Sequence, residues 1–404
     1  MIKKFFLIIK VLLRSKIVFK EPKKNKLVVF DKESSDELKP IIKDKVYFLM
    51  RNRSHQINKI YLTFGLIKRF IKNYNGNLMT SYLVSLLEVI KPKVVLTFID
   101  NSFKFSDLAK LLEKKIKFIA IQNAYRFDII ENDYLFKKKL TNINLNRRLY
   151  IPNLLCLGQH DVDIYKKYKI KLKKIIKVGS LRLANALQYI KRNKVKLKLF
   201  RYDVCVISDT TSKAHFLNLK RKEKNSGRHL DKGMADTVQY AVRYCMKHKK
   251  KFIFAIKNKE IGQINQKEEL NFYKKYLTND EYNFLILNIN KNRTGQYASY
   301  IAMFQSRVTV SSISTMLGEN LALGGKILAC NFTKLGILDF PIKGICFTKN
   351  ANYSKFEKKL TNIFLTSKKK YFSKLKERRN YIINYNKKVS TIQMIENEIK
   401  QALK

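Results

Sequence analysis

The chain has 404 residues, too many for one ordinary hydrophobic core, and this length predicts two domains. Hydrophobic residues make up 46% of it and aromatic residues 12%, a composition that excludes an intrinsically disordered protein. The formal net charge of +53 is spread over the whole chain; it is typical of AT-rich codon usage, yet it favours anionic substrates and lipids.

The N-terminal segment MIKKFFLIIKVLLRSKIVFK is basic and apolar. Lys10, Arg14 and Lys16 interrupt its apolar run, which is too short and too charged to span a bilayer. No small-residue cleavage site follows it, so we do not interpret it as a signal peptide. Two alternatives stay open: a segment that lies in an anionic membrane interface, and an ordinary first helix packed on its domain.

The first half alternates buried apolar runs with helical stretches. We expect strands at 26–31, 45–50, 93–102 and 117–123, further buried runs at 153–161 and 174–182, and helices at 76–90 and about 105–115. Lys91 and Pro92 end the first of these helices. Strands alternating with helices at this spacing predict a parallel, doubly wound sheet.

A second series follows the lysine-rich stretch 187–200, which we interpret as a linker. We expect strands at 202–210, 250–258, 282–288, 307–310, 326–332 and 344–350, and helices at 231–249, 266–277 and 295–305. The fold class is therefore α/β, with two Rossmann-like, doubly wound parallel-sheet domains and C-terminal helices. The predicted boundaries are 1–186 for an acceptor-side domain, 201–353 for a donor-nucleotide domain, and 354–404 for helices packing across both.

The cysteines are widely spaced and form no C-x-x-C pair, and most lie in apolar segments. This pattern predicts buried thiols in a reducing compartment and suggests neither a zinc site nor a disulfide framework. The five are Cys156, Cys205, Cys245, Cys330 and Cys346.

Ligands of open α/β sheets bind beyond the carboxyl ends of the strands, so the polar residues just after each apolar run are the candidates. In the first half these are Asp100-Asn101-Ser102, Gln122-Asn123, and Gly179-Ser180 with Arg182. In the second half they are Ser208-Asp209-Thr210-Thr211, Lys257-Asn258-Lys259, and the stretch 311–315.

The stretch TVSSISTMLGENLALGGKIL, residues 309–328, is the most organised of these. It places small hydroxyl groups between a strand and a helix, where exposed helix amides favour a phosphate group. Glu319, a little over one turn into the helix, would accept hydrogen bonds from a ribose diol, and Gly324-Gly325 would end the helix. The alternative is plain helix capping with Glu319 solvated on the outer face. The hydroxyl residues are Ser311, Ser312, Ser314 and Thr315.

This motif resembles the C-terminal donor-nucleotide motif of GT-B glycosyltransferases. It is most similar to the bacterial surface-polysaccharide group of CDP-glycerol glycerophosphotransferases, capsule Kdo transferases and polysialyltransferases. The stretches KFIAIQNAYR and KVGSLR resemble the N-domain strand and the interdomain segment of that group. The resemblance implies that Ser311, Ser312, Ser314 and Thr315 hold the donor phosphate or nucleotide and that Glu319 holds its ribose. It also slightly favours a CMP- or CDP-linked donor.

The chain departs from the group at two places. Where the group has Lys-x-His-Pro, this chain has IKNKE, so that only Lys257 carries over. After Gln122, Asn123-Ala124 replaces His-Gly.

An inverting transfer needs a base for the acceptor hydroxyl and positive charge at the leaving phosphate. Asp100 at a strand end is the candidate base, with capping of the following turn as its alternative role, and Asp209 is a second choice. Lys257 and Arg182 are the candidates that neutralise the leaving group. Asp161 and Asp163 form a D-x-D pattern, but they open a helical segment and are better interpreted as acids of a helix N-terminus. We expect neither a metal nor a cofactor.

The sequence thus predicts a metal-independent GT-B-like glycosyltransferase of cell-surface polysaccharide synthesis. Its expected substrates are a nucleotide sugar and a glycan or lipid-linked acceptor, and its expected place is the cytoplasmic face of the cell membrane, bound to anionic lipid and not to nucleic acid. Three alternatives stay open: a sugar 2-epimerase of the same fold, a basic nucleic-acid-binding protein, and a non-catalytic partner in glycan assembly.

Overall fold

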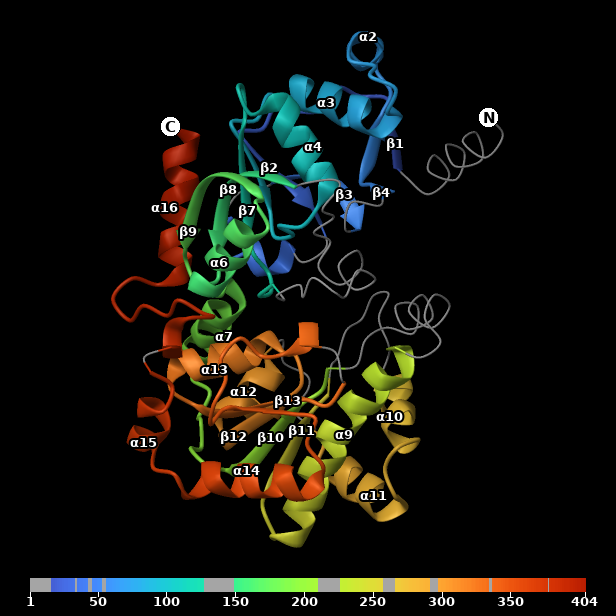
Figure 1. Cartoon of the computed structure of the whole chain (residues 1–404). Helices are drawn as coiled ribbons and strands as arrows, with labels where there is room; N and C mark the ends of the chain where they lie inside the picture. The colour runs from blue at the N-terminus through green and yellow to red at the C-terminus, as the bar shows by residue number, and fades with distance from the viewer. Residues whose placement is uncertain are drawn as a thin grey trace. The chain divides into compact units, whose positions relative to one another are not determined.

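The computed structural model describes residues 16–32, 35–42, 46–52, 56–126, 149–209, 226–256, 266–290, 297–333, 336–376 and 378–404. Within these ranges the chain divides into two compact units (Figure 1). The first unit comprises the described residues of Met1–Tyr125, Lys137–Asn185 and Asn386–Lys404, and the second comprises those of Arg126–Phe136 and Ala186–Tyr385. Both units are α/β, as the alternation of strands and helices predicts.

The first unit contains a largely parallel sheet in which seven strands are described, in the order β4-β3-β2-β6-β7-β8-β9. Among the described strands of this sheet, only the edge pair β3 and β4 is antiparallel. The first strand, β2, has β3 on one side and β6 on the other, so the direction of winding changes between β2 and β6. The strands are β2 Leu27–Asp31, β3 Tyr47–Asn52, β4 Gln56–Ile57, β6 Val94–Thr97, β7 Lys117–Ile121, β8 Tyr150–Cys156 and β9 Lys171–Lys177.

Apolar residues on both faces of this sheet pack against helices. One cluster joins Val29, Leu96 and Leu155 of the strands to Ile395 and Ile399 of the C-terminal helix α16, Thr391–Leu403. A short parallel pair, β1 Lys16–Val18 with β5 Lys59–Tyr61, lies apart from the main sheet. The remaining elements are η1 Ser35–Leu38, α2 Phe64–Lys72, α3 Leu78–Ile90, α4 Phe103–Leu112, α6 Gln159–Lys167 and α7 Leu181–Arg192.

The second unit contains a parallel sheet in which five strands are described, in the order β11-β10-β12-β13-β14. Its first strand, β10, lies between β11 and β12, so the winding changes direction between β10 and β12. In such sheets the carboxyl ends of the two strands at the switch point form the usual ligand crevice. The strands are β10 Tyr202–Ile207, β11 Phe252–Ala255, β12 Ser306–Ser311, β13 Lys326–Asn331 and β14 Phe347–Lys349.

Helices surround this second sheet (Figure 1). They are α9 Ser226–Lys247, α10 Gln266–Lys274, α11 Asn279–Leu287, α12 Ala298–Phe304, α13 Thr315–Leu323, α14 Tyr353–Leu365 and α15 Lys368–Ser373, with the short turns η2 Gly336–Leu338 and η3 Arg378–Asn380. The strand predicted at 282–288 is wrong, because these residues lie mostly in α11. Thr278 and Glu281 form a capping box that starts this helix, and a short apolar run by itself does not distinguish a buried strand from a helix.

All five cysteines are buried, as their apolar segments predict. Burial raises the pKa of Cys156, Cys205 and Cys346 to about 12, so these thiols stay protonated at neutral pH. Residues 187–192 of the predicted linker belong to α7. Of the N-terminal segment only residues from Lys16 on are described, and the two alternatives for residues 1–15 lie outside the described part. No helix in the described ranges is long and apolar enough to cross a membrane.

Candidate functional site

The β12–α13 junction lies at the switch point of the second unit. β12 ends at Ser311, and α13 begins at Thr315 with Ser314 as its N-cap, whose hydroxyl accepts a hydrogen bond from the Met316 amide at 3.4 Å. Gly324 ends the helix in the left-handed conformation, with φ 88°, which glycine adopts without strain. The strand, the helix start and the glycine stop all lie where the sequence motif predicts them.

Asp209, just beyond β10, ties this junction to its neighbouring strand. Its Oδ2 accepts hydrogen bonds from the backbone amides of Ser312 at 2.7 Å and Ile313 at 2.9 Å. The Ser311 hydroxyl lies 2.6 Å from the same oxygen and 2.8 Å from the Ile207 carbonyl, so its one hydrogen serves either acceptor. Asp209 is buried and bonded in this way to the loop of the motif, which makes it a positioning residue at the switch point.

The hydroxyl groups of the motif fall into two classes. Ser311 and Ser312 are buried, and the Ser312 hydroxyl lies 3.0 Å from the Thr237 hydroxyl of α9. Ser314 and Thr315, in contrast, are half-buried at the first turn of α13. The partly exposed Ser314 and Thr315 therefore lie at the first amides of the helix. The buried Ser311 and Ser312 connect the loop to neighbouring elements.

Glu319 is only 1% exposed, on the inner face of α13. Its Oε2 accepts a hydrogen bond from the Tyr300 hydroxyl of α12 at 2.8 Å. The alternative that placed Glu319 on a solvated outer face is therefore wrong. Burying a carboxylate without hydrogen-bond donors costs free energy, and the Tyr300 hydroxyl supplies one such donor.

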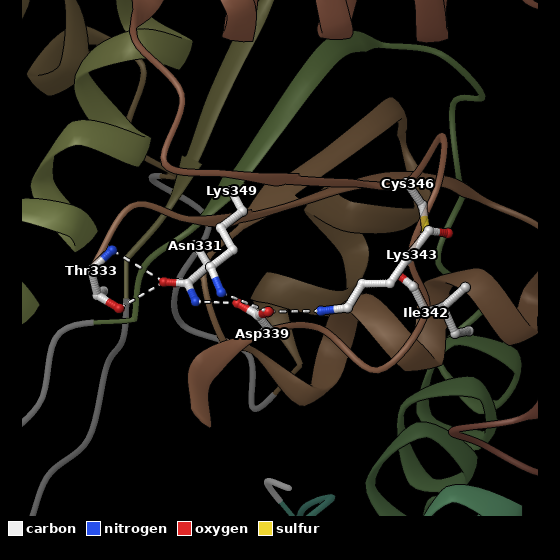
Figure 2. Close-up of polar contacts among 7 residues, drawn as sticks. All are labelled: Asn331, Thr333, Asp339, Ile342, Lys343, Cys346 and Lys349. Atoms are coloured by element: carbon white, nitrogen blue, oxygen red, sulfur yellow. Dashed lines mark hydrogen bonds and ion pairs between the residues drawn. The ribbon is translucent and has the colours of Figure 1, made fainter. Parts of the chain in front are cut away.

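A second polar cluster lies along the same edge of the sheet, at the ends of β13 and β14 (Figure 2). The Asn331 side chain accepts hydrogen bonds from the amide and hydroxyl of Thr333 and donates one to Asp339 at 2.5 Å. Lys343 and Lys349 each lie 3.0 Å from Asp339 Oδ2. Burial by itself would raise the pKa of Asp339, but the bonds from Lys343, Asn331 and Lys349 outweigh it and hold the pKa below its usual value.

We call these residues, Asn331, Thr333, Asp339, Lys343 and Lys349, the Asp339 cluster. This cluster was not predicted from the sequence. The available signal was Asn331, a polar residue directly after the apolar run KILAC.

The candidate residues of the first unit also lie at the carboxyl edge of their sheet. Asp100 follows β6, is fully buried, and accepts a hydrogen bond from the Tyr165 hydroxyl at 2.5 Å. Ser102 accepts the hydrogen bond from the Phe105 amide that caps α4.

Arg182 lies in the first turn of α7, beside the switch point of the first unit. Its Nε lies 3.4 Å from Glu37, which follows β2, and its guanidinium group lies 5.5 Å from the ring centre of Phe98, which follows β6. The side chain is partly exposed and is thus accessible to an anionic group.

Gln122 after β7 donates a hydrogen bond to Asp161 at 2.6 Å and accepts one from the Leu157 amide. Asp161 lies in the first turn of α6, as predicted for an acid of a helix N-terminus. Asp163 instead accepts a hydrogen bond from the Gln159 side chain. In the described ranges no three His, Cys, Asp or Glu residues come together as a ligand set for a metal ion.

Asp100 and Arg182 thus belong to the first unit. The candidate residues of the motif belong to the second unit; they are Ser311, Ser312, Ser314, Thr315 and Glu319. Lys257 lies outside the described residues, as do Thr210, Thr211, Asn258 and Lys259.

No protein-family model and no curated protein sequence matches this chain. Solved structures do match it over nearly its whole length. The Staphylococcus aureus MnaA–UDP complex aligns at 11% identity over 96% of this chain and 97% of that one, with a TM-score of 0.53. The UDP-GlcNAc 2-epimerase of Methanocaldococcus jannaschii, in complex with UDP-GlcNAc and UDP, aligns at 14% identity over 93% and 100%, with a TM-score of 0.51.

A variant of the wall teichoic acid polymerase TagF aligns at 12% identity over 94% of this chain and 90% of that one, with a TM-score of 0.51. These neighbours are two-domain GT-B structures. The chain has a GT-B fold. The expectation that the fold consists of two Rossmann-like domains is thereby confirmed. At this level of identity the likeness shows the fold alone, so the activity rests on the site.

Proposed function

We propose that this GT-B protein is a glycosyltransferase that moves a sugar from a nucleotide-sugar donor to a cell-surface polysaccharide or lipid-linked glycan acceptor. The observation that carries the proposal is the position of the motif 309–328 at the switch point of the second unit. There the half-buried Ser314 and Thr315 lie at the first turn of α13, where helix amides and the helix dipole favour a phosphate group.

Each candidate residue has a role in this proposal. Ser314 and Thr315 bind the donor phosphate, while Ser311 and Ser312, held by Asp209 and Thr237, keep the loop in shape for it. Glu319 binds the ribose, which requires that it exchange the Tyr300 hydroxyl for a ribose hydroxyl. The structures of neighbours with UDP or UDP-GlcNAc support a nucleotide sugar as substrate, and the motif's resemblance favours CMP or CDP.

In the transfer, the acceptor hydroxyl attacks the anomeric carbon and loses its proton to Asp100, while the bond from that carbon to the phosphate oxygen breaks. Arg182 and Lys257 offset the charge that develops on the leaving nucleotide. Because Asp100 is buried beneath Tyr165, the base role requires that the Tyr165 hydroxyl either moves away or relays the proton. The proposal includes no metal and no cofactor.

The proposed place of the reaction is the cytoplasmic face of the cell membrane, where the protein would bind peripherally. The net charge of +53 supports attraction to anionic lipid head groups.

Thermal-shift measurements with CMP, CDP, UDP and GDP test the donor site. We expect one of them to raise the unfolding midpoint, and Thr315→Ala and Glu319→Gln to weaken that effect by about tenfold in apparent affinity. Ser306→Ala is the matched control, because Ser306 lies at the amino end of β12, far along the strand from the motif's loop, where its hydroxyl bonds the Ala302 carbonyl. Absence of any nucleotide effect, together with tight and salt-sensitive binding of DNA or RNA, would overturn the proposal.

The second candidate is a sugar 2-epimerase, which the structural match to the M. jannaschii enzyme favours. The two activities differ in what they need, because an epimerase inverts C2 of the donor sugar without any acceptor. Incubation with UDP-GlcNAc alone, followed by NMR, distinguishes them. Formation of the C2 epimer without any acceptor would show that the protein is an epimerase and not a transferase. Release of free nucleotide only in the presence of a glycan acceptor would support transfer.

A further inference from the structure

The first unit carries a stripe of exposed apolar side chains on α2. The position of this helix is shown in Figure 1. Phe64 is 85% exposed, Ile67 45% and Ile71 69%. Their spacing of three and four residues places them on one face of the helix. Soluble surfaces rarely leave such a stripe in water, so it marks an interaction surface.

The orientation of α2 is held by its own contacts. Thr63 caps the helix, and its hydroxyl donates to Glu21 at 2.5 Å. Leu66 is buried on the opposite face, and the Asn73 side chain at the helix end donates to Ser85 and Glu88 of α3. Because these contacts fix the orientation of α2, Phe64, Ile67 and Ile71 face away from the rest of the first unit.

Further exposed apolar residues extend the stripe at the start of the helix. The register of β1 and β5 pairs Val18 with Tyr61, and the Leu62 amide donates to the Val18 carbonyl at 2.9 Å, so Phe19 and Leu62 are the next residues beyond the paired strands. Both Phe19 and Leu62 are exposed. The apolar surface therefore continues from α2 onto the segment after β1.

Basic residues flank the apolar stripe. Lys68 and Lys72 each follow a stripe residue by one position, Arg69 lies beside them, and all three are exposed. No Asp or Glu lies within α2, and Glu21, whose carboxylate accepts a hydrogen bond from Thr63 and lies beside Gly65, is the one acid that the described contacts place at the helix start. An apolar stripe beside a basic one fits the boundary between the head groups and the acyl chains of an anionic bilayer.

We propose that the α2 surface, made of Phe19, Leu62, Phe64, Ile67 and Ile71 with Lys68 and Lys72, docks the protein on an anionic phospholipid membrane. This inference deepens the membrane part of the proposed function by naming the surface that performs it. Phe64, Ile67 and Ile71 enter the apolar boundary, and the lysines bind head-group phosphates.

The chain contains no Trp, so a single introduced Trp reports on one position only. With Phe64→Trp, mixed phosphatidylglycerol–phosphatidylcholine vesicles should shift the emission to shorter wavelength, and brominated lipid should quench it. Leu287→Trp, at a position 71% exposed in the second unit, is the matched control and should respond to neither. Emission already blue-shifted without vesicles would show that another part of the chain covers α2, and would overturn the proposal.

Co-sedimentation with the same vesicles measures the contribution of each stripe. The triple variant Phe64→Ser, Ile67→Ser, Ile71→Ser should lose about tenfold or more of its partitioning. Leu287→Ser with Leu365→Ser removes apolar surface from equally exposed positions in the second unit and should leave partitioning unchanged. Equal binding by the triple variant and the wild type would overturn the proposal, as would a concentration-dependent dimer that the triple variant abolishes.

The basic stripe is tested with two pairs of substitutions that change the net charge by the same amount. Lys68→Glu with Lys72→Glu should reduce binding to the anionic vesicles by about tenfold. Lys368→Glu with Lys369→Glu, on exposed positions of α15, changes the total charge equally and should have a much smaller effect. Equal losses in the two pairs would mean that overall charge, and not the α2 surface, directs binding.

Nucleotide-induced thermal shifts should be retained in every α2 variant, because the candidate donor site lies in the second unit. Loss of vesicle binding and loss of nucleotide binding can therefore be told apart. Wild-type protein that binds nucleotide but no vesicles overturns only the docking surface.

Discussion

The carboxylate of Asp209 holds the backbone amide of Ser312 at 2.7 Å, across 103 residues of sequence. A second bond from the same oxygen reaches the Ile313 amide at 2.9 Å. A negative charge of the protein itself thus shapes the turn between β12 and α13, at the place where a donor phosphate is proposed to bind. The amides that Asp209 occupies are not the ones that the phosphate would use, since Ser314 and Thr315 begin the next turn.

Replacing Asp209 should loosen this turn and lower the stability of the second unit. Asp209→Ala leaves buried amides without their acceptor, so we expect a loss of about 2–4 kcal/mol in the free energy of unfolding. Urea-induced unfolding measures it, and hydrogen exchange of residues 308–317 locates it. Asp203→Ala is the control, because Asp203 bonds the Lys251 amide and Arg307 at the opposite end of β10. A loss no larger than that of the control would contradict the prediction.

Tyr300 and Glu319 should behave as an energetically coupled pair. Tyr300→Phe removes the hydroxyl that bonds a buried carboxylate at 2.8 Å, which we expect to cost about 1.5–3 kcal/mol. A double-mutant cycle with Glu319→Gln compares the losses in free energy of unfolding. The sum of the losses of the two single variants should exceed the loss of the double variant by about 1 kcal/mol or more. Additive losses would show that the two side chains do not interact in solution.

The Asp339 cluster should make the second unit sensitive to acid. The folded-state pKa of Asp339 lies below that of the unfolded chain, so its contribution is present above the unfolded pKa of about 3.9 and is lost as the pH falls through the folded value. The unfolding midpoint of Asp339→Asn should therefore lie below that of the wild type at pH 6–7, and the two should converge below about pH 3–4.

The matched control for Asp339→Asn is Asp36→Asn. Asp36 pairs only with the exposed Lys39 among the described contacts and should change the midpoint little at pH 7. A difference between wild type and Asp339→Asn that stays constant down to pH 3 would contradict the prediction.

Two helical glycines should respond in opposite directions to alanine. At Gly233 of α9 a Cβ atom would lie 2.5 Å from the Thr333 backbone nitrogen, so Gly233→Ala must displace the loop after β13 and should lower the unfolding midpoint. At Gly65 of α2 the nearest atom is the flexible Glu21 carboxylate at 3.1 Å, so Gly65→Ala should gain up to about 1 kcal/mol of helix propensity. Circular dichroism melting curves compare the two, and a stabilising Gly233→Ala would show that the loop moves at no cost.

Much of the secondary structure was predictable because its signals are local. Runs such as KLVVF and DVCVI read as strands from a few neighbouring residues, and β2 and β10 lie there. The motif 309–328 likewise carries its own strand, helix start and glycine stop. The error at 282–288 has the same origin, because an apolar run that short fits both a buried strand and a helix.

The sequence by itself determined the alternation of strands and helices, the two-domain GT-B architecture and the place of the motif 309–328 within it. Only the tertiary structure decided the partners: Tyr165 for Asp100 and Tyr300 for Glu319 come from positions 65 and 19 residues away. It also decided that Ser312 faces the interior while Phe64 faces solvent. The physical reason is that burial and hydrogen bonding of a side chain depend on which elements pack beside it, and that packing is set by contacts between residues distant in the chain.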